Sequence, residues 1–137
     1  MMDWSFNRFQ LTLTGLWWGW GLLLFLLLVA LSSQSAIFGD DASAAWQWFL
    51  PNITPSMGLV GAASYARRKT ADVEPAVIKP LFLMAAIVSV VYLLLLTVSL
   101  FGVFYSADPL AWLGKSSLWL GPLQGLAASA LAVFFAK

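Results

Sequence analysis

The sequence predicts an all-α integral membrane protein with four transmembrane helices and both termini in the cytoplasm. Hydrophobic residues make up 61% of the chain and charged residues only 9%, whereas soluble domains carry about 25% charged residues. Four apolar segments are each long enough to cross a bilayer, which takes about 20 helical residues. We expect a single domain over residues 1–137, with helices near 15–37, 45–66, 80–105 and 117–136.

The first predicted helix, near residues 15–37, starts with a tryptophan-rich stretch and continues as GLLLFLLLVAL. Such a continuous apolar run lacks the alternation of a barrel strand. It is longer than the apolar region of a signal peptide and has no clear small-residue cleavage site, so we expect the mature chain to retain it. The residues before it are expected to form a short amphipathic stretch on the inner membrane surface.

The second predicted helix, near residues 45–66, contains Pro51 and Pro55. Proline lacks a backbone N–H and clashes with the carbonyl four residues earlier in a regular helix. We therefore expect the helix to bend or unwind between Leu50 and Pro55, in the outer third of the membrane. Carbonyls freed there need partners in protein or water, and Gln124 of the last helix lies at a similar depth by topology.

The third and fourth predicted helices complete the bundle. The segment near 80–105 is the longest and is expected to tilt in the membrane. The segment near 117–136 shares a Trp-x-x-Pro pattern with the second helix, in WLGPLQ and WFLPN, with a carboxamide shortly afterwards in both. This match suggests a two-plus-two repeat of helical hairpins, although chance explains a match of this length equally well.

Orientation follows from the cations, because lysine and arginine stay on the cytoplasmic side of a membrane. Lys115 is the only cation in the segments expected outside, whereas six cations flank the inner ends: Arg8, Arg67, Arg68, Lys69, Lys79 and Lys137. A second interpretation makes Arg67, Arg68 and Lys69 a contact for anionic lipid or for a cytoplasmic partner protein of loop 67–79. Tryptophans near the helix ends are expected to form an interfacial belt.

Polar residues gather by topology in the outer half of the predicted membrane domain. One interpretation is a hydrated vestibule above a hydrophobic constriction. The other is ordinary hydrogen bonding between helices. The candidates for the vestibule or pore are Gln34, Asn52, Thr54, Ser56 and Gln124.

Small residues recur every four positions on the second and fourth predicted helices, and such spacing lets helix backbones approach closely in lipid. We expect helix packing at these positions and a tight contact at Gly125. The sequence does not distinguish a partner helix in the same chain from one in another copy. The residues are Gly58, Ala62, Ala66, Gly121, Gly125 and Ser129.

Several classes of function lack the residues they need. The chain has no histidine and no cysteine, which excludes Ser/His catalysis and Cys/His zinc sites. No charged residue lies inside a predicted span, and pumps and proton relays normally use such residues. We therefore expect no enzyme activity, no metal and no cofactor. The net charge of +1 gives no reason to expect nucleic acid as a partner.

Two functional hypotheses fit the sequence best. The first is a small homo-oligomeric channel or membrane-permeabilising effector in the bacterial inner membrane, acting in antiviral or stress defence. Four helices in one chain pack into a solid bundle, so a pore would form between copies. The second is a non-catalytic accessory or assembly subunit of a larger membrane complex. A small-molecule transporter is a third interpretation, weakened by the absence of charge inside the membrane.

Overall fold

The computed structural model describes residues 4–66 and 75–136. In these ranges the chain is helical almost throughout, and its described elements follow in order: α1 (Trp4–Ser32), α2 (Ser35–Phe38), α3 (Ala42–Ala66), α4 (Pro75–Phe101), the 3₁₀ turn η1 (Gly102–Phe104) and α5 (Pro109–Ala136). The prediction of an all-α chain with four long helices is confirmed.

Three of the described helices are long and apolar enough to cross a membrane: Arg8–Ser32, Lys79–Phe104 and Pro109–Ala136. The helix α3 does not reach that level of apolarity over its described length, although it has 25 residues. Gln47, Asn52 and the two prolines lower its hydropathy. The prediction of four apolar spans is therefore confirmed for three segments and not for residues 45–66.

Helix α1 begins well before the predicted start at residue 15. The stretch that the sequence suggested as a separate amphipathic element is the first part of this helix, from Trp4 onward. Its threonines are accommodated by bonding back to the helix, since the Thr12 hydroxyl donates to the Arg8 carbonyl and the Thr14 hydroxyl to the Gln10 carbonyl, each at 2.8 Å. Leu13 on the same turn is fully buried.

At one end of the bundle, a glycine and a helix cap determine where α2 ends and α5 begins. Gly39, with φ of 62°, ends α2 in the left-handed conformation that glycine adopts without strain. Helix α5 starts earlier than predicted because Asp108 caps it, accepting a hydrogen bond from the Ala111 N–H at 3.3 Å. Pro109 follows at the first helical position, where its missing N–H is not needed.

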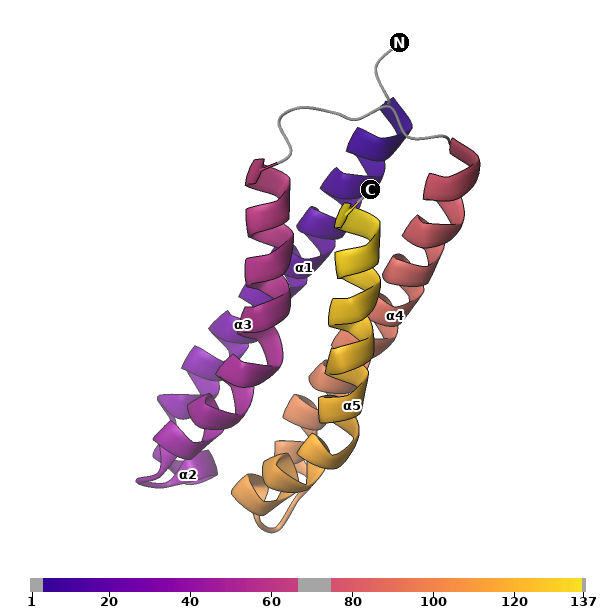
Figure 1. Ribbon diagram of the computed structural model, residues 1–137. Coiled ribbons are helices and arrows are strands. Elements are labelled where there is room, and N and C mark those ends of the chain that lie inside the picture. The colour runs from indigo at the N-terminus through magenta and orange to yellow at the C-terminus, as the bar shows by residue number, and fades with distance from the viewer. Residues whose placement is uncertain (1–3, 67–74, 137) are drawn as a thin grey trace.

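The four long helices form a bundle in which α1 contacts α3 and α4, and α5 contacts the same two helices (Figure 1). The order around the bundle is therefore α1, α3, α5, α4. Helices α1 and α4 run in one direction and α3 and α5 in the other (Figure 1). Both described ends of the chain lie at the same end of the bundle, which agrees with the predicted hairpins; which end faces the cytoplasm stays a prediction.

The interior of the bundle is filled with large side chains. Trp17, Phe49, Tyr92 and Phe134 come from the four different long helices, and each is fully buried. Leucines from α1, α4 and α5 pack around them. Native-like packing of this kind leaves little room inside one chain, so the described core is a solid one.

Candidate functional site

The two prolines of α3 lie inside an unbroken helix. The axis of this helix changes direction part-way along its length, as does that of α5, whereas α1 and α4 run straighter (Figure 1). The prediction that the segment bends or unwinds between Leu50 and Pro55 is wrong for unwinding, and a bend at these residues stays a prediction. At Pro55 a neighbouring side chain supplies the hydrogen bond that the proline removes, which is one way transmembrane helices tolerate proline.

The clearest replacement is at the Pro51 carbonyl. In a regular helix this oxygen would accept from the N–H of residue 55, which is a proline and has none. Instead the Gln124 side chain of α5 donates its Nε2–H to the Pro51 oxygen at 2.7 Å. The prediction that Gln124 serves a carbonyl freed in α3 is confirmed. The same bond ties α3 to α5.

Asn52 forms the centre of a buried polar cluster that joins three helices. Its Nδ2 donates to the Trp48 carbonyl at 2.6 Å. The Tyr92 hydroxyl of α4 donates to the Asn52 carbonyl at 2.5 Å, and its oxygen lies 3.4 Å from Asn52 Oδ1. The Trp48 indole donates to the Ser116 hydroxyl of α5 at 2.9 Å. Because α3 and α4 are not neighbours around the bundle, Tyr92 spans its interior.

Ser56, one turn along α3 from Asn52, is fully buried and its hydroxyl has no hydrogen-bond partner in the described structure. A serine in a helix usually donates to the carbonyl four residues earlier, which here is the Asn52 carbonyl. Tyr92 already occupies that oxygen. The unpaired Ser56 hydroxyl is thus explained by competition for one acceptor.

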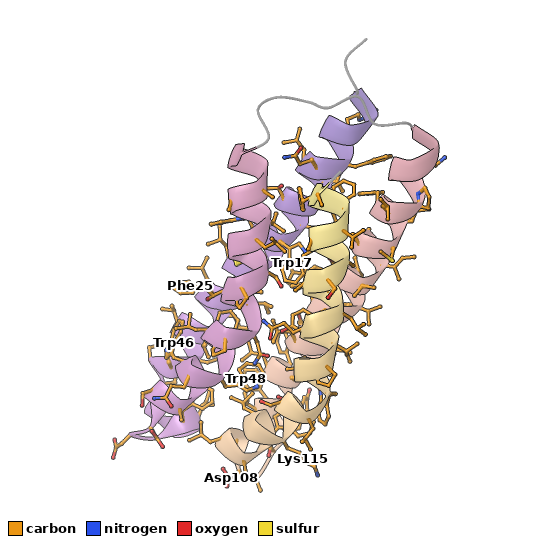
Figure 2. The ribbon with its side chains drawn as sticks, in the orientation of Figure 1. Trp17, Phe25, Trp46, Trp48, Asp108 and Lys115 are labelled. Carbon is orange, nitrogen blue, oxygen red and sulfur yellow. The ribbon has the colours of Figure 1, made fainter. Side chains whose placement is uncertain are left out.

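Tryptophan side chains connect the helices through their indole N–H groups. Trp17 and Trp20 of α1 donate to Ser89 and Thr97 of α4 at 3.0 and 2.8 Å. Trp112 of α5 donates to the Ser99 carbonyl of α4 at 2.7 Å. Figure 2 shows Trp17 and Trp48 inside the bundle. The expectation of an interfacial belt is therefore wrong for these two rings, which are buried.

The structure separates the predicted vestibule residues. Asn52 and Ser56 are buried, and Gln124 is partly exposed beside them. Thr54 is exposed on the outer side of α3, and Gln34 is exposed in the turn after α1. A vestibule made of all five within one chain is not formed; the role of Thr54 and Gln124 in a path between copies stays a prediction.

The small residues predicted to pack helices together do not do so within the chain. A Cβ atom built at Gly58, Gly121 or Gly125 would meet no atom of another helix within 4 Å, and Ala62 and Ser129 are exposed as well. The expected tight contact at Gly125 is therefore wrong for the single chain. The side chain of Ala66 lies outside the described part of the structure, as do Arg67, Arg68 and Lys69.

Other glycines provide the close contacts instead. A Cβ atom at Gly21 would lie 2.6 Å from the Met57 sulfur, and one at Gly61 would lie 3.2 Å from the Trp18 ring. Gly102 faces the Trp112 ring with no room for a side chain. These positions had no regular spacing, so the small-residue pattern did not reveal them. For Gly61 and Gly102, the tryptophans opposite them, Trp18 and Trp112, were the signal available in the sequence.

Sequence reasoning also missed the hydroxyl partners on α4. Ser89, Thr97 and Ser99 lie in the most apolar segment, and Ser89 and Ser99 are buried. A buried polar group is normally hydrogen-bonded, so each hydroxyl in that segment indicated a partner on a neighbouring helix.

Among residues 4–66 and 75–136, no group of three or more side chains could hold a metal ion. Comparison of the chain with protein-family models, curated proteins and solved structures finds no match.

Proposed function

We propose that the protein is a membrane-embedded subunit that associates with copies of itself and forms a small channel or membrane-permeabilising assembly. The observation that supports this proposal is a difference between two sides of the bundle. Helices α1 and α4 present large apolar side chains outward, among them Leu22, Leu26, Ile87 and Val98. These are the side chains that face lipid in membrane proteins.

The side formed by α3 and α5 is different. Leu50 is the single exposed large apolar residue among those described in α3. On α5, Leu118, Leu126 and Val133 are exposed as well. Around them, the outer surface of α3 and α5 carries small, polar or proline residues, which let two helix backbones approach closely in a membrane. They are Gln47, Pro51, Thr54, Pro55, Gly58, Ala62, Gly121, Pro122, Gly125 and Ser129, all exposed. We define these residues as the small-residue face.

Backbone carbonyls on this face give a second reason to expect a partner. Pro51 and Pro122 have no N–H, so the Gln47 and Leu118 carbonyls cannot accept the regular helical bond. Both prolines are exposed, so these carbonyls lie on the outer surface of the bundle. A backbone acceptor at membrane depth requires protein or water rather than lipid. A ring of copies with α3 and α5 turned inward would provide both.

The path for solutes would then run between copies, since the core of one chain is filled by side chains such as Trp17 and Phe134. Gln47, Thr54 and Gln124 would line its outer half. Helices α1 and α4 would face the lipid. A role in bacterial antiviral or stress defence belongs to the same proposal and has the sequence expectation as its only support.

The alternative is an accessory subunit of a larger membrane complex. In that case the small-residue face would meet a different protein, and loop 67–79 would offer a cytoplasmic contact. The features of the face fit either partner. A homo-oligomer is favoured here because α3 of one copy can contact α5 of the next, and a repeated contact of this kind closes a ring when the rotation fits.

The test begins with the purified chain in mild detergent, where light scattering measures the number of copies. We expect a defined homo-oligomer that passes ions in planar bilayers. Gly58→Leu and Gly125→Leu should shift the particle to monomers and abolish the current. Gly19→Leu is the control, because Gly19 is also exposed and unobstructed but lies on α1. A monomeric wild type, or equal effects of all three changes, would contradict the proposal.

A further inference from the structure

A groove lies between α1 and α3, and only Thr54 and Gly58 of its lining belong to the small-residue face. It encloses about 290 Å³ and its lining is almost entirely apolar. That volume is at the lower end for small-molecule sites in proteins, which span about 300–1,000 Å³. The floor is formed where Gly21 meets Met57 and Ile53. Gly58, on the groove wall, leaves an opening because nothing occupies the space of a side chain there.

Aromatic contacts between the same two helices lie at both ends of the groove. At one end the Phe25 and Trp46 rings meet edge to face, with centroids 5.2 Å apart, and Figure 2 shows the two side by side. At the other end the Trp18 ring lies against Gly61. Trp18 and Phe25 are seven residues apart on α1, so the groove is about 10 Å long at 1.5 Å per residue.

We propose that this groove binds a segment of a phospholipid acyl chain. The groove is continuous with the lipid-facing surface, because Leu22 and Phe25 line it and are also among the exposed large residues of α1. Hydrocarbon is therefore what meets it in a bilayer. Its walls carry no charged side chain, and Thr54 provides the one side-chain hydroxyl. Such a lining fits methylene groups and offers nothing to a charged headgroup.

The preference for a bound chain over ordinary contact with fluid lipid comes from packing. Inside a membrane there is no hydrophobic gain from moving a hydrocarbon chain onto a protein, so close van der Waals contact decides the association. A chain in the groove touches α1, α3 and the aromatic ends at once, whereas a chain on a convex helix surface touches one side only. Gly58 belongs both to the groove and to the small-residue face, so Leu22→Trp on α1 is the variant that tests the groove independently of a pore.

The test uses the full chain in vesicles of palmitoyl-oleoyl phosphatidylcholine that contain a small fraction of the same lipid with a photoactivatable diazirine in one acyl chain. Irradiation followed by peptide mass spectrometry locates the adducts. We expect them to concentrate on the groove residues Trp18, Phe25, Leu50 and Met57. Labelling spread evenly over the outer surfaces of α1 and α4 would overturn the inference.

Two variants should close the groove and lower labelling on the order of tenfold, a change that corresponds to about 1.4 kcal/mol. Gly58→Phe places a ring in the opening. Leu22→Trp enlarges a side chain that is already 50% exposed on the rim, so the bundle should tolerate it. Gly19→Phe is the matched control, since Gly19 is exposed on α1 but does not line the groove. Circular dichroism of the same samples verifies that each variant is helical.

Equal labelling of Gly58→Phe, Leu22→Trp and Gly19→Phe would contradict a specific site. Failure of the proposed channel gives a different result, because it would appear as missing current while groove labelling remains. A second groove between α1 and α4, lined in part by Gly15, Trp20 and Phe101, is an internal reference. It has no pair of aromatic rings bridging its ends among the described ring contacts, and we expect it to be labelled less.

Discussion

On the α1–α4 side of the bundle, Trp17 and Trp20 donate hydrogen bonds to Ser89 and Thr97. On the α3–α5 side, Trp48 donates to Ser116 in the same way. The outer surfaces of the two sides differ. The α1–α4 side presents mainly leucine, isoleucine and valine, whereas on the α3–α5 side Leu50, Leu118, Leu126 and Val133 stand among the residues of the small-residue face. The two sides thus resemble each other inside and differ outside.

This difference separates two requirements that act on a helix in a membrane. Inside the bundle an indole or hydroxyl group needs a partner wherever it lies, because an unpaired buried polar group is costly. The outer surface has to match whatever surrounds the chain. The interior residues therefore determine how the chain folds, and the outer residues determine whether lipid or another protein surrounds it.

The largest effect should come from the interior of the α1–α4 side. Trp17→Ala removes a fully buried ring and its hydrogen bond to Ser89, and substitutions of this kind destabilise by about 3–5 kcal/mol. Trp18→Ala is the matched control, because the neighbouring ring is 41% exposed and its loss should cost well under half as much. Denaturant unfolding in detergent, followed by far-ultraviolet circular dichroism, measures both. Equal losses would mean that Trp17 is not a core residue.

The next test compares a glycine that faces the bundle interior with one on its outer surface. Gly102→Ala adds a methyl group against the Trp112 ring, and overpacking of this kind costs about 1–3 kcal/mol. Gly125→Ala meets no atom and should be neutral or stabilising by up to about 1 kcal/mol, since alanine favours a helix over glycine. Both are measured on chains held monomeric in detergent. A clear loss of stability at Gly125 would show that the small-residue face is packed within the chain.

The helices themselves could be predicted from the sequence, because runs such as GLLLFLLLVAL are long, apolar and without alternation. Helix starts were less accurate: Asp108 and Pro109 form a cap that places the start of α5 before its apolar run. The link between Gln124 and a carbonyl freed by Pro55 was also predictable, because it follows from a missing N–H and a shared depth. Its geometry adds that the exact acceptor is the Pro51 oxygen.

Other features could not be predicted because they depend on which way a side chain faces. Regular spacing of Gly121 and Gly125 indicated one face of a helix, but spacing alone does not say whether that face turns toward the core or away from it. Tryptophans near helix ends fit an interfacial belt equally well as an interior bond. Their hydroxyl partners are far away in sequence, as with Trp17 and Ser89. The helix order around the bundle had to be known first.

The bond between the two helices of the small-residue side offers a smaller and sharper test. Gln124→Leu removes the donor to the Pro51 carbonyl and should cost about 0.5–1.5 kcal/mol, the net worth of one hydrogen bond. In a Pro55→Ala background the helix regains the N–H that serves the same oxygen, so Gln124→Leu should then cost less. The measurement is a double-mutant cycle of unfolding free energies. Additive effects would mean that Gln124 does not compensate for the proline.

The smallest effect concerns the competition between Tyr92 and Ser56 for the Asn52 carbonyl. Tyr92→Phe removes the hydroxyl that spans the bundle interior, and bonds between membrane helices are worth about 0.6 kcal/mol on average. Ser56 then becomes free to donate to that carbonyl, as Thr97 does to the Leu93 carbonyl at 2.7 Å. Part of the loss should therefore be recovered within α3 itself.

Ser56→Ala reveals that recovery. Alone, it removes a buried hydroxyl that has no partner, so it should be neutral or slightly stabilising. Combined with Tyr92→Phe, it leaves the Asn52 carbonyl without either side-chain donor, and the full loss should appear. Tyr92→Phe is thus expected to cost more in the Ser56→Ala background than in the wild type, by a few tenths of a kcal/mol or more. If Tyr92→Phe costs the same in both backgrounds, the two hydroxyls do not compete, and the unpaired state of Ser56 needs another cause.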